Sequence, residues 1–320
     1  MVIRFSACQD GRAARVSHRG RPNRGGKTHL FNLAGRPDRG ANASRRASYR
    51  GLVSDQAPSA GVLNAFGVKG RPLALSGGQG TAWRAGHLVF KPDAGTCHCW
   101  LGVRLVAVEP EDVRIAKPVP TRLGPWRHEG WVATRWVEGV EPNRSATTVW
   151  LDIIEAGRAF HRAVAHLSRP RCLDARKDPW AAADRAAWGE GAVHLHPAFA
   201  AVARRLHDGL EPLGCSQLVH GDLTGNVLFA PDLPPAVIDM SPYWRPPEYA
   251  EGVVVADALS WHDAPPSVLS DAGVSVAAVA RALLFRMLTT SQRVVEGETT
   301  KIEIVEEAHR YDGAASAIGL

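Results

Sequence analysis

The stretch LVHGDLTGNVLF, residues 218–229, decides the fold, because it holds an apolar strand, a polar loop and a second apolar strand in twelve residues. Ten residues beyond Asn226, the run AVID at 236–239 predicts another strand, which ends on the carboxylate of Asp239. Short runs rich in Val, Leu and Phe favour strands. We therefore expect residues 218–229 to form a hairpin that holds the polar loop side chains at one edge.

Three polar residues of this region have the side chains that phosphoryl transfer requires. The reaction needs one carboxylate to orient the acceptor hydroxyl and take its proton, and it needs an amide oxygen and a second carboxylate for the metal. Asp222 is the predicted base, and Asn226 and Asp239 are the predicted ligands of magnesium. The competing interpretation is an ordinary turn, since Gly and Asp favour turns.

A Gly-rich segment, SGGQGT at 76–81, lies between two apolar runs closer to the N-terminus. Glycines let the backbone approach phosphate oxygens and offer N–H donors without obstruction. Gly77, Gly78 and Gly80 are therefore predicted to contact the phosphates of a nucleotide. The alternative is a plain hairpin turn, because a Gly-rich turn between strands is common.

With these motifs the sequence resembles the aminoglycoside phosphotransferase and choline kinase branch of the protein-kinase-like superfamily, which carries HGDxxxxN followed by an (I/L)D strand. It looks most similar to an uncharacterised actinobacterial family in which HGDL-x-GNVLF recurs, and the resemblance covers roughly residues 58–290. The resemblance implies a two-lobed α+β fold with ATP and Mg²⁺ as cofactors. It gives the catalytic role to Asp222 and the metal to Asn226 and Asp239.

The resemblance also implies four supporting roles. His220 would brace the catalytic loop, and Asp257 would lie on a helix beneath that loop and accept backbone N–H bonds. Lys91, at the end of the run LVFK, would meet the α- and β-phosphates. Residues 136–139 would form the junction of the lobes, where adenine hydrogen-bonds to the backbone.

One departure from the family pattern is the length of the catalytic loop. The common pattern places Asn five residues after Asp, whereas Asp222 and Asn226 are four residues apart. A shorter loop can still deliver the amide to the metal, although the geometry must differ. The short loop is one motive for an alternative, a pseudokinase that binds nucleotide and acts as a sensor or scaffold.

The second departure is the absence of the helical Glu that usually pairs with the lysine. Residues 96–100 contain no acid, and Glu109 and Glu111 border a proline, which disfavours a helix interior. Either one of these two acids substitutes, or Lys91 is held differently. This departure also favours the pseudokinase alternative.

The chain divides into four predicted segments, which are a disordered basic arm, a nucleotide-binding N-lobe, a C-lobe with the catalytic loop and metal site, and a polar tail. Their bounds are 1–57, 58–142, 143–290 and 291–320. The segment MSPYWRPPE that follows AVID is short and Pro-rich, unlike the activation loop of a protein kinase. This favours a small hydroxylated or aminated acceptor. Helices are predicted at 59–67, 99–108, 150–167, 178–188, 199–210 and 274–290.

The charge is uneven along the chain, although the net charge is +6 over 320 residues. Residues 1–50 hold 12 Lys or Arg against two acids, which leaves the remainder at −4. A mildly acidic body argues against nucleic-acid binding, except through the arm. No run is apolar enough for a membrane span and no secretory signal is visible, so we expect a cytoplasmic protein whose five cysteines are reduced.

These observations predict an ATP-dependent phosphotransferase that acts on a hydroxyl of a small molecule. The pseudokinase and a nucleic-acid-associated protein that works through the basic arm are the alternatives. The sequence names neither the acceptor nor the oligomeric state.

Overall fold

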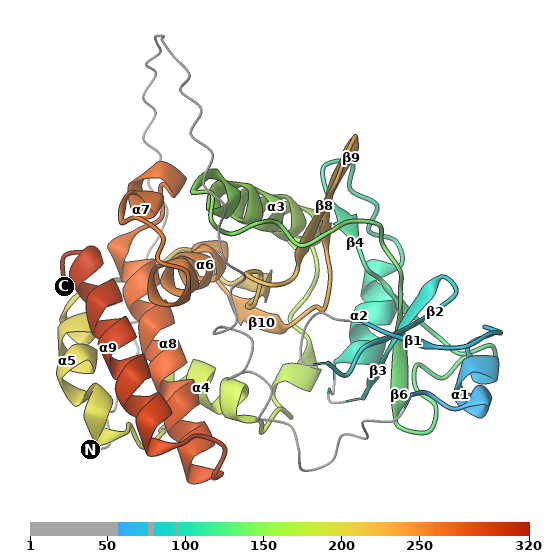
Figure 1. The fold of residues 1–320 in the computed structure, drawn as a ribbon, viewed down its shortest axis with the longest axis horizontal. Coiled ribbons are helices and arrows are strands. Elements are labelled where there is room, and N and C mark those ends of the chain that lie inside the picture. Colours follow the sequence, from blue (N-terminus) through green and yellow to red (C-terminus); the bar gives the residue numbers. More distant parts are fainter. Residues whose placement is uncertain (1–56, 76–79, 94, 96) are drawn as a thin grey trace, which may run out of the picture.

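The computed structural model describes residues 57–75, 80–93, 95 and 97–320, which form a small β-rich N-terminal lobe and a larger, mostly helical C-terminal lobe (Figure 1). The predicted α+β two-lobed architecture is confirmed. In Figure 1 the N-terminal lobe lies on the right, and the helices α5, α8 and α9 form the opposite end. Residues 1–56 of the predicted arm lie outside the described part of the chain.

The N-terminal lobe is built on a five-stranded antiparallel sheet of order β1-β2-β3-β6-β5. Alternation along β3 buries Leu88 and Phe90 and leaves Val89 and Lys91 on the other face. The predicted helix at 59–67 is confirmed, with Ser59 as its cap. The elements are α1 Ala60–Ala65, β1 Leu73–Ala74, β2 Trp83–Ala85, β3 Leu88–Pro92, α2 His98–Leu105, β5 Pro118–Val119 and β6 Trp131–Arg135.

The C-terminal lobe packs around α6 and α8, which are buried along most of their length. These two helices approach closely, since a Cβ on Gly252 would lie 2.6 Å from the backbone of Ala278. The helices predicted within 150–210 and 274–290 are confirmed. No helix among the described residues is both long and apolar enough to cross a membrane. The helices are α3 Thr148–Val164, α4 Pro179–Ala187, α5 Ala200–Asp208, α6 Pro247–Trp261, α7 Ser267–Ala272, α8 Val276–Val295 and α9 Lys301–Ala317, with 3₁₀ turns at Arg171–Leu173 and Pro197–Phe199.

The predicted hairpin over 218–229 is wrong, because its two strands pair with different partners. The first, β7 Gln217–His220, pairs with β10 Pro242–Arg245, and the second, β8 Val227–Ala230, pairs with β9 Leu233–Val237. Asp232 has a φ of +57° and lies in the tight turn between β8 and β9, which favours pairing between these neighbours. The polar loop therefore connects two separate ladders.

The prediction of a polar tail over residues 291–320 is wrong, because most of this segment is helical. Helix α8 continues to Val295, and α9 follows with a capping box between Thr300 and Glu303. Helix α9 packs against α5, α6 and α8. The buried residues of α9 are few and lie on one face of the helix. The helical periodicity of the apolar residues in the sequence is therefore weak. The buried residues are Ile304, Tyr311, Ala314 and Ala315.

Two features connect the lobes in ways that the sequence did not indicate. Strand β4, Arg114–Ile115, comes from the predicted N-lobe segment but pairs in parallel with β9 of the other lobe. Cys97, the residue before α2, forms a disulfide with Cys172 in the first 3₁₀ turn. The expectation that all five cysteines are reduced is therefore wrong for this pair. Cys99 and Cys215 are free.

Candidate active site

The loop over residues 221–226 is braced by the fully buried ring of His220. Nδ1 of His220 accepts the backbone N–H of Asp222 at 3.1 Å, and Nε2 lies 3.0 Å from the carbonyl oxygen of Ile238. Since Nδ1 accepts, the ring hydrogen is on Nε2, which donates to Ile238. Burial lowers the pKa of His220, so the ring is neutral. One side chain thus ties the loop to the residue that precedes Asp239.

A second buried histidine supports the first. His161 of α3 accepts the backbone N–H of His220 on its Nε2 at 3.1 Å. Burial, with a smaller effect from nearby His220, lowers the pKa of His161 to about 3. Sequence reasoning missed His161, whose available signal was only its place on the apolar stripe of α3 beside Phe160.

Asp222 and Asn226 lie next to each other in spite of their short spacing. Nδ2 of Asn226 donates to the backbone carbonyl of Asp222 at 2.6 Å and lies 3.5 Å from its Oδ2. The side chain of Asp222 is 38% exposed, so its carboxylate is open to solvent. The shortened loop therefore still brings the amide to the carboxylate.

The β8–β9 ladder brings Asn226 close to Asp239, because the N–H of Ile238 donates to the carbonyl of Asn226 at 2.9 Å. Asp239 has a φ of +50°, a conformation that Asp tolerates better than most residues. Nδ2 of Asn226 is used as a donor, which leaves its Oδ1 as an acceptor. An amide oxygen and a carboxylate suit Mg²⁺, which takes few protein ligands and completes its shell with water and phosphate. The donor set therefore fits magnesium.

Lys91 reaches this site from the opposite lobe. Its Nζ lies 2.6 Å from Oδ2 of Asp239, and both side chains are partly exposed, at 33% and 48%. Burial opposes the ionisation of Asp239, but Lys91 outweighs it, so the pKa of Asp239 is lowered. The pair therefore holds Asp239 ionised and links the two lobes at this point.

The expected helical partner of Lys91 is replaced by this contact. Glu109, one of the two candidate substitutes, pairs with Lys117 instead. Helix α2 begins at His98 and has no acid in its first turn. Of the two alternatives left open by the sequence, the structure favours the second, since Lys91 is held by Asp239.

The predicted nucleotide-binding segments are described in part. Gly77 and Gly78 lie outside the described residues, and Gly80 has a φ of +75° just before β2. Residues 136–139 join the lobes as predicted from the resemblance. The backbone N–H of Trp136 donates to the carbonyl oxygen of His87 in the N-terminal lobe, and the next bridge, Val140 with Phe229, reaches β8.

A cavity of about 730 Å³ lies beside this junction. The guanidinium of Arg84 lies 4.1 Å from the ring centre of Trp136 at its wall. Gly139 has a φ of +146°, and a Cβ there would lie 2.8 Å from that of Leu228, so the backbone approaches β8 closely. The cavity is lined by Arg84, Trp136, Glu138, Gly139, Val140, Phe229, Ala230 and Pro231.

Asp257 lies beneath the loop on α6, as expected, but its partners differ from the expectation. It was expected to accept backbone N–H bonds. Instead it accepts the hydroxyl of Thr224 at 2.9 Å and two bonds from Arg286 of α8, at 2.9 and 2.6 Å. Asp257 is 1% exposed, and its buried charge is paired with the guanidinium of Arg286. Arg286 was not predicted, because nothing local in the sequence marks it.

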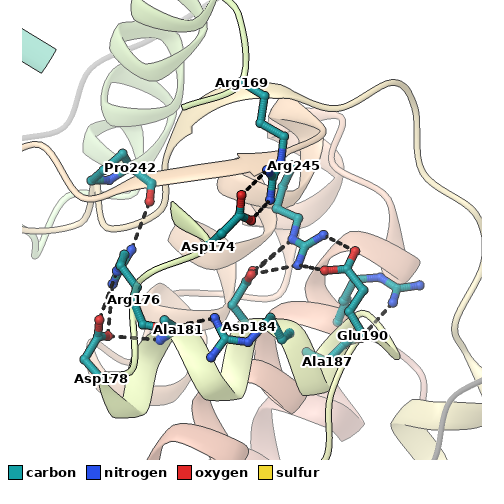
Figure 2. Close-up of polar contacts among 12 residues, drawn as sticks. Arg169, Asp174, Arg176, Asp178, Ala181, Asp184, Ala187, Glu190, Pro242 and Arg245 are labelled. Atoms are coloured by element: carbon teal, nitrogen blue, oxygen red, sulfur yellow. Dashed lines mark hydrogen bonds and ion pairs between the residues drawn. The ribbon is translucent and has the colours of Figure 1, made fainter. Parts of the chain in front are cut away.

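Arginine–carboxylate pairs fasten β10, the strand that follows Asp239, to the helical lobe (Figure 2). Arg176 pairs with Asp178 and donates to the carbonyl of Pro242 at 3.0 Å. Arg245 pairs with Asp184 at 2.8 Å and with Glu190 at 2.7 Å. The segment after AVID is thus a short fixed strand, in contrast to a long mobile loop.

No protein-family model matches the sequence, and no curated protein matches it. Solved structures do resemble the fold. An aminoglycoside phosphotransferase from Alicyclobacillus acidocaldarius has a TM-score of 0.52 and 16% identity, over 82% of this chain and 94% of its own. The aminoglycoside phosphotransferase APH(4)-Ia has a TM-score of 0.52 and 17% identity, over 81% and 97%.

A thermostable mutant of APH(4)-Ia, in ternary complex with AMP-PNP and hygromycin B, has a TM-score of 0.52 and 15% identity, over 81% of this chain and 97% of its own. At such low identity the likeness concerns the fold alone. The chain therefore has the two-lobed, protein-kinase-like fold of the aminoglycoside phosphotransferases. The narrower resemblance to an actinobacterial family stays a prediction.

Proposed function

We propose that the protein transfers the γ-phosphoryl group of ATP, with magnesium, to a hydroxyl of a small molecule. The observation that carries this proposal is that Asp222, Asn226 and Asp239 lie together on the C-terminal lobe, with Lys91 reaching Asp239 from the other lobe. Phosphoryl transfer requires this set of side chains. The complex of similar fold with AMP-PNP and hygromycin B supports a nucleotide and a small-molecule acceptor.

Each residue has a defined part in this proposal. Asp222 orients the acceptor hydroxyl and takes its proton as the oxygen attacks phosphorus. Asn226 and Asp239 hold magnesium, which when bound neutralises charge on the phosphates. Lys91 and the Gly-rich segment 77–80 position the phosphates, and the backbone of 136–139 binds adenine. His220 and Asp257 support the loop from below.

The short segment after AVID supports a small acceptor. Protein kinases hold a peptide against a long loop at this point, whereas here β10 and α6 follow within a few residues. The arginine pairs of Figure 2 fix this strand in place. A hydroxylated or aminated acceptor is a prediction from the sequence. The cytoplasmic location is a prediction of the same kind.

The test compares unfolding midpoints without ligand, with ATP, and with ATP plus magnesium chloride. A ligand that binds only the folded chain raises the midpoint. We expect a magnesium-dependent rise in the wild type that is lost in Asp239→Asn. Asp232→Asn is the matched control, since Asp232 also has a positive φ, of +57°, and lies on an exposed turn.

Acceptors are then screened by transfer of labelled phosphate from ATP to aminoglycosides, choline and neutral polyols. Transfer that falls to background in Asp222→Ala supports the proposal. If millimolar MgATP leaves the midpoint of the wild type unchanged, the nucleotide site and the catalytic assignments are both wrong.

One observation favours the pseudokinase alternative. Lys91 is paired with Asp239, a predicted metal ligand, and Glu109 is paired elsewhere. A protein that only binds nucleotide would show the magnesium-dependent rise but no turnover above that of Asp222→Ala. Nucleic-acid binding through the basic arm concerns residues outside the described part, so it stays a prediction from the sequence.

A further inference from the structure

Arg286 joins the helical core to the loop that carries Asp222. It projects from the middle of α8, and its side chain is 14% exposed. Nε and Nη2 donate to the two carboxylate oxygens of Asp257 at 2.9 and 2.6 Å. Nη2 also donates to Oδ1 of Asp222 at 3.2 Å. The guanidinium therefore contacts two carboxylates from two different elements.

The two carboxylates have different environments. Asp257 is 1% exposed and is fully committed, since it accepts Arg286 on both oxygens and the hydroxyl of Thr224 on one. Asp222 is 38% exposed and receives a single bond from Arg286 on Oδ1. The charged pair with Asp257 thus fixes the guanidinium. The second hydrogen on Nη2 of Arg286 is then available to donate to Asp222.

We propose that Arg286 is a positioning residue that sets the orientation of the Asp222 carboxylate, a role that rests on the proposed function of Asp222. The terminal torsion of Asp is broad, so the two oxygens exchange places freely unless a partner distinguishes them. Arg286 holds Oδ1 toward α8. Oδ2, which lies 3.5 Å from Nδ2 of Asn226, is then the oxygen offered to the acceptor hydroxyl.

A purely structural role is the rival explanation, in which Arg286 serves only to neutralise Asp257. The two explanations differ in what happens when both charges are removed together. The double variant Asp257→Asn/Arg286→Gln leaves no buried unpaired charge, so a structural role predicts normal catalysis in the folded protein. A positioning role predicts that Asp222 loses its orientation even though the fold is intact.

The kinetic experiment measures ATP turnover, with water as the acceptor until a better one is known, in Arg286→Gln, Arg286→Lys and the double variant. We expect kcat to fall by about 10- to 100-fold in Arg286→Gln and in the double variant. The KM for MgATP should stay within about twofold, because Arg286 contacts no predicted nucleotide ligand. Arg286→Lys should recover part of kcat.

The matched control is Arg281→Gln. Arg281 is on the same helix but donates to the carbonyl of Ala187 in α4 at 2.8 Å, not to the loop. It should lower stability without lowering kcat. A double variant that keeps kcat within twofold of the wild type would overturn the positioning role, and so would an equal loss in Arg281→Gln.

Crystal structures of the wild type and the double variant provide a readout that does not need turnover. The positioning role requires the Asp222 carboxylate to rotate or become disordered in the variant, and an unchanged carboxylate would refute it. If the wild type shows no ATP turnover with water or with any of the screened acceptors, the proposed phosphotransferase function fails. The crystallographic comparison still decides whether Arg286 orients Asp222.

Discussion

Lys91 of β3 and Asp239, two residues beyond β9, form a 2.6 Å ion pair between the two lobes. Lys91 is the proposed partner of the phosphates, and Asp239 is the proposed ligand of magnesium. Lys91 thus contacts the carboxylate that is proposed to bind magnesium, and Asp239 contacts the ammonium group that is proposed to bind phosphate. Binding of MgATP must exchange this pair for contacts with phosphate and metal.

Removal of the Asp239 charge should therefore change how magnesium affects the binding of ATP. In Asp239→Asn we expect ATP alone to bind up to about fivefold more tightly than in the wild type, because a partly exposed ion pair is worth at most about 1 kcal/mol. Magnesium should then add little affinity. Lys91→Met should weaken binding with and without magnesium. Isothermal titration of the three proteins checks this, and a full magnesium effect in Asp239→Asn would contradict it.

Stability should fall in mild acid because of His161. The pKa of its ring is about 3 in the folded protein, well below the usual value, so between pH 6.5 and 3 the unfolded chain binds the proton and the folded chain does not. The contribution of His161 to the free energy of unfolding is then present in full above pH 6.5 and is lost as the pH falls toward 3. From pH 7 to pH 5 the loss should be about 2 kcal/mol for this residue.

The variant His161→Gln tests the assignment, since the amide oxygen can still accept the N–H of His220 and does not titrate. Urea unfolding at pH 7 and pH 5 should show a pH dependence that is about 2 kcal/mol smaller in the variant. Parallel pH dependence in the two proteins would mean that the burial of His161 has no such effect.

The disulfide between Cys97 and Cys172 should make a large part of the stability sensitive to reduction. It closes a loop with a sequence separation of 75, for which chain entropy predicts about 4 kcal/mol. A dithiol reductant and the variant Cys97→Ser/Cys172→Ser should both lower the urea midpoint to a similar extent. Alkylation followed by peptide mass analysis checks the bond directly. Modification of both thiols in the unreduced folded protein would show that the bond is not formed.

Two helical glycines should respond to alanine in opposite directions. A Cβ on Gly252 of α6 would lie 2.6 Å from the backbone of Ala278, so a methyl group must separate α6 from α8 and should cost about 1–3 kcal/mol. Gly313 of α9 has open space around its Cβ position, and alanine there should stabilise by about 1 kcal/mol. Thermal unfolding of both variants measures this. Similar shifts in the two variants would mean that α6 and α8 are not in such close contact.

Apart from the Gly-rich segment, Lys91 and Asp257, the residues of the candidate site that were predicted from the sequence lie close together along the chain. His220, Asp222, Asn226 and Asp239 fall within one short stretch, where type and spacing are visible. Arg286 is 64 residues from Asp222, and His161 is 59 residues from His220. Contacts over such separations depend on how α3 and α8 pack, and no local pattern records this packing.

The errors in the fold have the same origin. The strand character of β7 and β8 was visible, but their partners were not, because apolar alternation does not distinguish one neighbouring strand from another. The pairing of Lys91 with Asp239 could not be predicted, because the two residues are far apart in the sequence and lie on different lobes. Gly77 and Gly78 lie outside the described residues, so their predicted role is unchanged.

The two ladders that flank the loop have a consequence for how activity can be controlled. The β7–β10 ladder sets the position of Asp222, the β8–β9 ladder sets that of Asp239, and His220 joins the two internally. The loop over residues 221–226 is therefore held on both sides, by the two ladders and by His220. We therefore expect any control of this protein to act on the separation of the two lobes, by changing how often the loop over residues 221–226 and the N-terminal lobe approach each other.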